Sequence, residues 1–241
     1  MRLFLRGLLI VLALAGLSWS VSILRTELQI APIRDVAERI IVRQTFTMEA
    51  LAPVLKHLDE TQPKCVNGTE YAAVIRLYAA ATAHTSQMPD AQQLLTKALE
   101  EAVSALWCSP HQGFLWYAVF WLEKALGSPP TKYIPALDLS YDVAPNEGWI
   151  ARFRNPDALE LYSDLDASLQ SKIRDEYRYL LRDRINVAVT VLGEAPAPVR
   201  NIILKILQDL PLETRENFAK HVDSANLVVD IPGVDYKRVK R

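Results

Sequence analysis

The sequence predicts an all-α protein that carries a single N-terminal membrane helix. Glycine is scarce, with 8 in 241 residues, about half of the usual share of roughly 7%, and tight β-hairpins and phosphate-binding loops depend on glycine. A charge-free apolar run opens the chain, and beyond it apolar residues recur at helical spacing. The 27 basic and 28 acidic residues nearly cancel, so no nucleic-acid partner is expected, because such binding needs a strongly basic surface.

The apolar run Gly7–Leu24 predicts a transmembrane helix. Its 18 residues would extend about 27 Å as a helix, which is enough to cross the hydrocarbon core of a bilayer. The alternative is a signal peptide that is cleaved after Ser20. Both interpretations keep Arg2 and Arg6 in the cytoplasm and export the chain from Arg25 onward. In a bacterium, the chain would be a single-pass inner-membrane protein whose bulk lies in the periplasm.

Two helices are expected directly after this run. Ile33–Arg43 has apolar residues at helical spacing and follows Pro32, a residue that the start of a helix tolerates. Met48–Leu58 is predicted as the second helix, with Thr47 as its N-cap. Pro53 lies inside this helix and predicts a kink or a break, because proline has no N–H to donate.

The segments Thr69–Thr85 and Asp90–Trp107 are predicted to form an antiparallel helical hairpin, because a short turn joins them. Cys65 precedes the first helix and Cys108 follows the second, so the hairpin brings the two positions together. An exported compartment is oxidising, and a Cys65–Cys108 disulfide is therefore expected; the alternative is two buried free thiols. The bond would close a loop of about 44 residues and contribute about 3–4 kcal/mol in the chain-entropy description.

A spacing of about 34 residues recurs in the middle of the chain. Pro110 and Pro145 are 35 residues apart, and Trp116 and Trp149 are 33 residues apart. In each copy a proline ends one helix and an aromatic residue opens the next. This period resembles the tetratricopeptide repeat (TPR), which implies a short TPR-like superhelix of stacked helix pairs.

The TPR-like resemblance covers residues 69–184, with 113–146 as its best-matched unit. The last unit departs from the pattern, because Asn155-Pro156 predicts a break or a kink in what should be one helix. A short helix Asp157–Leu165 and a longer helix Ser168–Arg184 are expected in its place.

Two motifs and the N-terminal run carry a second resemblance. The motifs are CSPHQGFLWYAVFWLE at 108–123 and APNEGWIARFRN at 144–155. Together with the run, they are similar to an uncharacterised bacterial family of membrane-anchored, TPR-like proteins that are often encoded beside exopolysaccharide or capsule genes. This resemblance implies a role in the cell envelope and brings no activity with it.

The C-terminal part is also predicted to be helical, with one segment left open. Ile185–Leu192 is rich in β-branched residues and fits a strand or a buried helix. Val199–Leu210 and Glu213–His221 are amphipathic and predict helices. The chain therefore divides into four predicted parts: an anchor or uncleaved signal (1–25), N-terminal helices and a linker (26–68), TPR-like repeats (69–184), and C-terminal helices with a basic tail (185–241).

No catalytic, cofactor-binding or metal-binding motif is found in the sequence. None of the four histidines has a partner His or Cys at ligand spacing, and no nucleophile elbow or phosphate loop occurs. Glu147 lies beside Gly148 and Trp149, but the serine and the Gly-rich context of a lytic transglycosylase are missing. We therefore expect no enzymatic activity, no cofactor and no metal.

An aromatic cluster between Phe114 and Trp121 fits either the core or a binding surface. Its five aromatic residues in eight positions are more than one helix face holds, so one or two should face outward. Basic residues follow nearby and would suit an acidic peptide or a sugar acid. The candidate partner-binding residues are Trp116, Tyr117, Phe120, Trp121, Asn146, Glu147, Trp149, Arg152 and Arg154.

These features favour a non-enzymatic, membrane-anchored periplasmic scaffold that binds protein partners in the cell envelope and serves exopolysaccharide assembly or export. The alternative is an accessory subunit of a larger inner-membrane complex, held there by its N-terminal helix. The sequence sets neither the identity of the partner nor the oligomeric state.

Overall fold

The computed structural model describes residues 2–61, 68–145 and 147–235. All regular structure in these ranges is helical, and no β-strand occurs among them, so the all-α prediction is confirmed. The chain forms two compact units, Met1–Pro110 and His111–Arg241. The boundary between these units falls inside the predicted repeat region 69–184, and the predicted basic tail at 236–241 lies outside the described residues.

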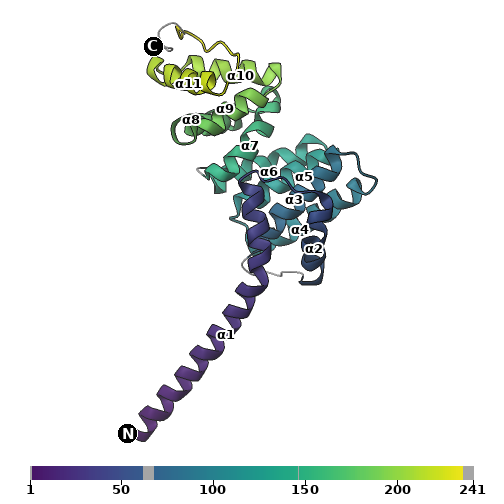
Figure 1. Cartoon of the computed structure of the whole chain (residues 1–241), viewed down its shortest axis with the longest axis vertical. Coiled ribbons are helices and arrows are strands. Elements are labelled where there is room, and N and C mark those ends of the chain that lie inside the picture. Colours follow the sequence, from purple (N-terminus) through teal and green to yellow (C-terminus); the bar gives the residue numbers. More distant parts are fainter. Residues whose placement is uncertain (1, 62–67, 146, 236–241) are drawn as a thin grey trace. The chain divides into compact units, whose positions relative to one another are not determined.

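Figure 1 shows the helices of both units. Unit 1 contains α1 (Arg2–Ile41), α2 (Met48–Thr61), α3 (Thr69–Thr85) and α4 (Ala91–Cys108). Unit 2 contains α5 (Gly113–Ala125), α6 (Pro130–Val143), α7 (Gly148–Glu160), the short 3-10 helix η1 (Tyr162–Asp164), α8 (Ala167–Asp183), α9 (Ile185–Glu194), α10 (Ala197–Gln208) and α11 (Leu212–Ser224).

Helix α1 runs without a break from the predicted membrane run to Ile41. The prediction of a separate helix that begins after Pro32 is therefore wrong, because Pro32 lies inside α1. Proline removes the hydrogen bond that its own N–H would donate, but Pro32 is exposed and leaves the packed side of the helix intact. That side packs on α3 and contains the buried residues Ile30, Ile33, Ala37 and Ile40.

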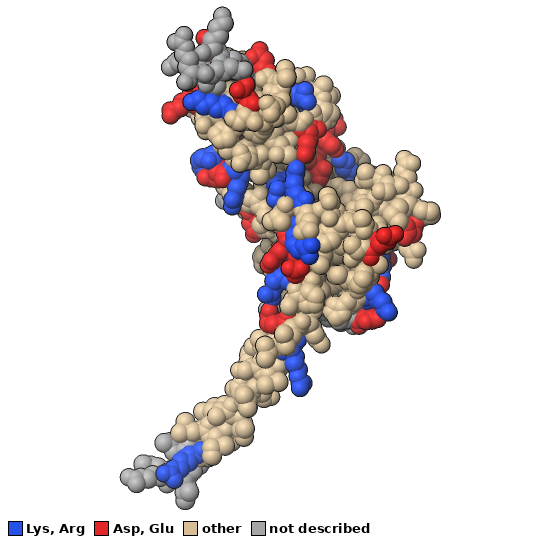
Figure 2. Space-filling model, viewed as in Figure 1, with Lys and Arg blue, Asp and Glu red and all other residues tan. Residues whose placement is uncertain are grey.

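The two halves of α1 have different surroundings. Figure 1 shows the N-terminal half projecting alone from α2, α3 and α4, and Figure 2 shows it as a surface free of charged side chains beyond the basic group near its tip. Its large apolar side chains from Leu9 to Leu24 are exposed. The stretch Leu9–Ile41 is long and apolar enough to cross a membrane. This apolar surface is unfavourable in water and matches what a spanning helix presents to lipid.

Helix α3 is the centre of unit 1, since it contacts α1, α2 and α4. Its buried positions are largely alanines, whose small side chains let three neighbours approach: Ala72, Ala73, Ala79, Ala80 and Ala83. The buried Arg76 of α3 pairs with Asp59 of α2 and, through Nε at 2.7 Å, with Oε2 of Glu101 of α4. Lys97 Nζ lies 2.7 Å from the same Asp59 carboxylate. Burial would raise the pKa of Asp59, but the hydrogen bonds from Lys97 and Arg76 outweigh it and lower the pKa.

Helix α2 keeps Pro53 inside it and continues to Thr61. The predicted N-cap is confirmed, because Thr47 Oγ1 accepts a hydrogen bond of 3.2 Å from the backbone N–H of Ala50. Helix α4 ends at Cys108, one residue later than predicted, so Cys108 still lies at the end of the hairpin. Cys65 lies outside the described residues, so the Cys65–Cys108 disulfide stays a prediction.

In unit 2, α7 continues through Pro156 to Glu160, so of the break or kink predicted at Asn155-Pro156, the break does not occur. The chain turns later, at η1, before α8 begins. Asn155 is fully buried, and its amide donates to the carbonyl of Ile173 on α8 at 3.1 Å. This packing offsets the hydrogen bond that Pro156 cannot donate. The open segment at Ile185–Leu192 is helical, and its apolar side chains lie in the core, where α9 contacts α7, α8 and α11.

Candidate interaction site

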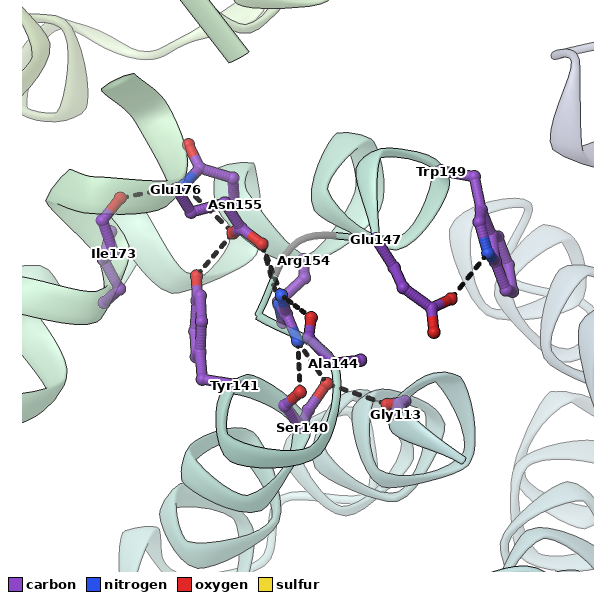
Figure 3. A network of polar contacts seen from close by, with 10 residues as sticks. All are labelled: Gly113, Ser140, Tyr141, Ala144, Glu147, Trp149, Arg154, Asn155, Ile173 and Glu176. Atoms are coloured by element: carbon purple, nitrogen blue, oxygen red, sulfur yellow. Dashed lines mark hydrogen bonds and ion pairs between the residues drawn. The ribbon is translucent and has the colours of Figure 1, made fainter. Parts of the chain in front are cut away.

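A buried arginine lies at the centre of unit 2 (Figure 3). Arg154 on α7 is 0% exposed, and its guanidinium donates to Glu176 Oε1 on α8 from Nε at 3.1 Å and from Nη2 at 2.5 Å. The same group donates to Ser140 Oγ at 2.8 Å and to the Ala144 carbonyl at 3.0 Å, both on the α6 side. A buried charge is tolerated only when it is paired and hydrogen-bonded, and Arg154 meets both conditions.

The carboxylate of Glu176 is satisfied on its second oxygen as well. Glu176 Oε2 accepts hydrogen bonds from Tyr141 Oη at 2.8 Å and from Asn155 Nδ2 at 3.2 Å. Burial, and next the neighbouring Glu176 carboxylate, raise the pKa of Tyr141 well above its usual range, so its phenol remains a donor. The guanidinium carbon of Arg154 lies 3.9 Å from the centre of the Tyr141 ring, a cation–π contact.

The network extends to α5 through a serine. Ser140 Oγ donates to the carbonyl of Gly113, the first residue of α5, at 2.8 Å. A methyl group at Gly113 would lie only 2.2 Å from the Cβ of Ala144, so the two helices approach too closely there for a larger residue. We name this set the Arg154 network: Gly113, Ser140, Tyr141, Ala144, Arg154, Asn155, Ile173 and Glu176. Because it is buried and links α5, α6, α7 and α8, its role is to hold these helices in place.

Three residues that the sequence assigned to a partner surface are in the core. Arg154 belongs to the buried network, and Tyr117 and Phe120 are also buried. Phe120 fills the space under α6 and lies 6.0 Å from the ring of Tyr133. These three assignments are therefore wrong. Sequence spacing shows which residues share a helix face, but burial depends on the helices that cover that face.

Tyr117, which is buried, contacts a second carboxylate that is itself half-buried. Its hydroxyl donates to Asp157 Oδ2 of α7 at 2.7 Å. Burial raises the pKa of Asp157 from 3.8 to about 6, although the hydrogen bond from Tyr117 and the charge of Lys124 oppose this effect. The carboxyl group of Asp157 therefore changes charge near pH 6.

Other predicted surface residues reach solvent at the start of α7. The indole of Trp149 is half-buried and stacks on Phe114 of α5 with ring centres 5.0 Å apart. Its Nε1 donates to Glu147 Oε2 at 3.0 Å, and Glu147 is exposed (Figure 3). Arg152 follows one helical turn later and is half-buried. Trp149 connects the two charged residues, because Glu147, the N-cap of α7, is hydrogen-bonded to its indole and Arg152 lies three residues after it on the helix. We name Glu147, Trp149 and Arg152 the α7 face.

The remaining predicted residues are not all on one surface. Trp116 and Trp121 are half-buried, but a spacing of five residues turns them about 140° apart on α5, so they cannot share one face. Asn146 lies outside the described residues. The candidate interaction site is therefore reduced to the α7 face.

The structure adds residues to this face that the sequence did not single out. A methyl group at Gly148 would lie 3.0 Å from Tyr179 Oη and 3.3 Å from Arg184 Nε, which places both side chains beside the start of α7. Tyr179 also lines an open cleft of about 600 Å³ that contains Asp175, Arg178, Leu181, Arg182, Leu210, Glu213, Thr214 and Asn217. These residues are more than 25 positions from Trp149, and no local pattern connects them with it.

Among the described residues, no group of three or more His, Cys, Asp or Glu is arranged to hold a metal ion. Comparisons with known protein families, with curated proteins and with solved structures find no match to this chain. The fold and the site thus define a class in structural terms alone: an all-helical protein with one apolar N-terminal helix and a half-exposed Trp–Arg–Glu face on unit 2.

Proposed function

We propose that the protein is a membrane-anchored scaffold that binds a protein partner through unit 2. One observation carries the proposal: α1 is a single helix whose apolar N-terminal half is unburied and whose other half belongs to the core of unit 1. Because α1 is continuous from its unburied apolar half to its packed half, it connects unit 1 directly to the membrane. The short basic segment before the span supports a cytoplasmic N-terminus and an exported, periplasmic bulk.

The helical pairs support the TPR-like part of the proposal. Helices α3 and α4 pack as one pair, and α5 and α6 pack as another. In TPR-like proteins such pairs present concave surfaces to peptides. A role in exopolysaccharide assembly or export is proposed from the resemblance of the two motifs at 108–123 and 144–155. The proposed partner is a protein of the cell envelope that docks on the α7 face.

The experiment that tests this function is crosslinking and mass spectrometry on the full chain in native membranes. We expect crosslinks from unit 2 to one envelope protein, and we expect the variants Arg152→Ala and Trp149→Phe to weaken them. Lys205→Ala is a matched control, because Lys205 is exposed on α10 and away from the α7 face in sequence. Recovery of the same crosslinks from all three variants would exclude the α7 face as the docking site.

The second candidate function is an accessory subunit that is held in a complex through α1. Exchanging the membrane span distinguishes it from the scaffold. Replacing Gly7–Leu24 by an unrelated apolar span keeps the chain in the membrane but removes specific helix–helix contacts. A scaffold that binds through unit 2 should keep its partner after this exchange. Loss of the partner would favour the accessory subunit.

A further inference from the structure

The most exposed tryptophan of the described residues belongs to unit 1 and not to the predicted surface. Trp107 is 86% exposed at the end of α4, and Val103, one turn earlier on the same face, is 41% exposed. Exposing the large apolar surface of a tryptophan side chain to water is unfavourable. Tryptophan is favoured at boundaries between an apolar environment and water. The position of Trp107 within unit 1 indicates which environment surrounds its side chain.

An ion pair fixes the level of Trp107 along α3. Arg76 lies seven residues after Thr69, the start of α3, and Glu101 lies seven residues before Cys108, the end of α4. These two side chains are in contact at 2.7 Å. Because α3 and α4 run antiparallel, the contact places Trp107 beside the first turn of α3.

The first turn of α3 lies at the membrane-proximal end of unit 1. A methyl group at Gly68, just before α3, would lie 2.9 Å from the side chain of Ile30 on α1. On α2, His57 Nε2 lies 3.4 Å from the carbonyl oxygen of the adjacent Gln29. The C-terminal part of α2 and the start of α3 therefore lie beside the part of α1 that directly follows the span, and the end of α4 lies level with the start of α3.

This level corresponds to the outer edge of the headgroup layer of the membrane. Ile30 is five residues beyond Arg25, which is about 7–8 Å along a helix, and the headgroup layer adds about 5–7 Å on each side of the hydrocarbon core. The apolar exposed side of α1 also continues past Arg25, since Leu24 is 58% and Leu28 is 65% exposed. Two helices thus bring exposed apolar side chains to the same depth.

We propose that Trp107 and Leu28 insert into the headgroup layer of the bilayer that α1 spans. This inference rests on the membrane insertion in the proposed function. The second contact, on α4, opposes tilting of unit 1 away from the membrane and holds one side of it against the bilayer. Tryptophan suits this position because its ring is apolar and its N–H meets water or headgroups.

The test is tryptophan quenching of the full chain in nanodiscs of phosphatidylcholine brominated near the top of its acyl chains. The emission of Trp107 is obtained as the difference between the spectra of the unsubstituted chain and the Trp107→Phe variant. The emission of Trp19, which lies in the span, is obtained in the same way from the Trp19→Phe variant. We expect the brominated lipid to quench both parts. A matched control is Val42→Trp in the Trp107→Phe background, because Val42 is 70% exposed at the far end of α1, about 18 Å further from the bilayer than Ile30.

The outcomes separate this inference from the function on which it rests. Quenching of Trp19 and Trp107 but not of the tryptophan at position 42 supports the inference. Quenching of Trp19 alone overturns it while α1 remains inserted. Absence of quenching at Trp19 overturns the membrane insertion itself.

Discussion

Removal of Glu176 should be the most damaging single change in unit 2. The substitution Glu176→Ala deletes a carboxylate that accepts two hydrogen bonds from Arg154 and one each from Tyr141 and Asn155. All of these donors stay buried, and the guanidinium keeps its charge. Breaking a buried ion pair on one side costs about 3–5 kcal/mol, so we expect a loss of about 4 kcal/mol in the free energy of unfolding of unit 2.

The assay is urea unfolding of the full chain in detergent micelles, followed by far-ultraviolet circular dichroism and by the tryptophan emission of unit 2. The matched control is Lys172→Ala on the same helix, which removes half-exposed ion pairs to Asp138 and Asp142. Such pairs contribute about 0–1 kcal/mol. The double variant Arg154→Met/Glu176→Leu should lose less than Glu176→Ala, because no unpaired charge then remains buried.

The reasoning is refuted if Glu176→Ala costs no more than Lys172→Ala. It is also refuted if the loss of the double variant equals the sum of the losses of Arg154→Met and Glu176→Leu measured separately, because contacting residues should be strongly non-additive. Either result would mean that the Arg154 network is not a coupled buried unit.

Two further predictions concern the same unit. Gly113→Ala should destabilise it by about 1–3 kcal/mol, although alanine normally favours a helix, because the new methyl would meet Ala144 Cβ at 2.2 Å; an unchanged or raised melting temperature would contradict this. Asp157 has a pKa of about 6 when folded and 3.8 as its ordinary value, so the folded state binds more protons between these values and the free energy of unfolding should fall as pH rises from about 4 to 6. Asp157→Asn should flatten this dependence in urea titrations at several pH values, and an unaltered slope would show that another group is responsible.

The helices could be predicted from the sequence because their signals are local. Apolar residues at helical spacing predicted α3, α4, α10 and α11 within a few residues of their ends. The N-cap at Thr47 could be predicted because it depends on a few neighbouring positions. The scarcity of glycine could be counted directly from the sequence. The errors fall at Pro32 and Pro156, where packing on other helices outweighs the local cost of proline.

The candidate site was only partly predictable, for a different reason. Trp149 and Arg152 reach the surface as expected, but Tyr117, Phe120 and Arg154 do not. An arginine in an aromatic-rich segment is usually exposed, since burial of its charge requires a partner. That partner is more than twenty positions away, and nothing near Arg154 in the sequence indicates it.

The sequence by itself determined that this protein is helical and that its first helix is long and apolar enough to cross a membrane, because both properties depend on residues a few positions apart. Only the tertiary structure decided that α1 joins the apolar run to the core of unit 1 and that Arg154 pairs with Glu176 in the interior. It also placed Trp107 beside the start of α3. These features depend on which helices pack together, and such contacts between distant segments leave no periodic trace along the chain.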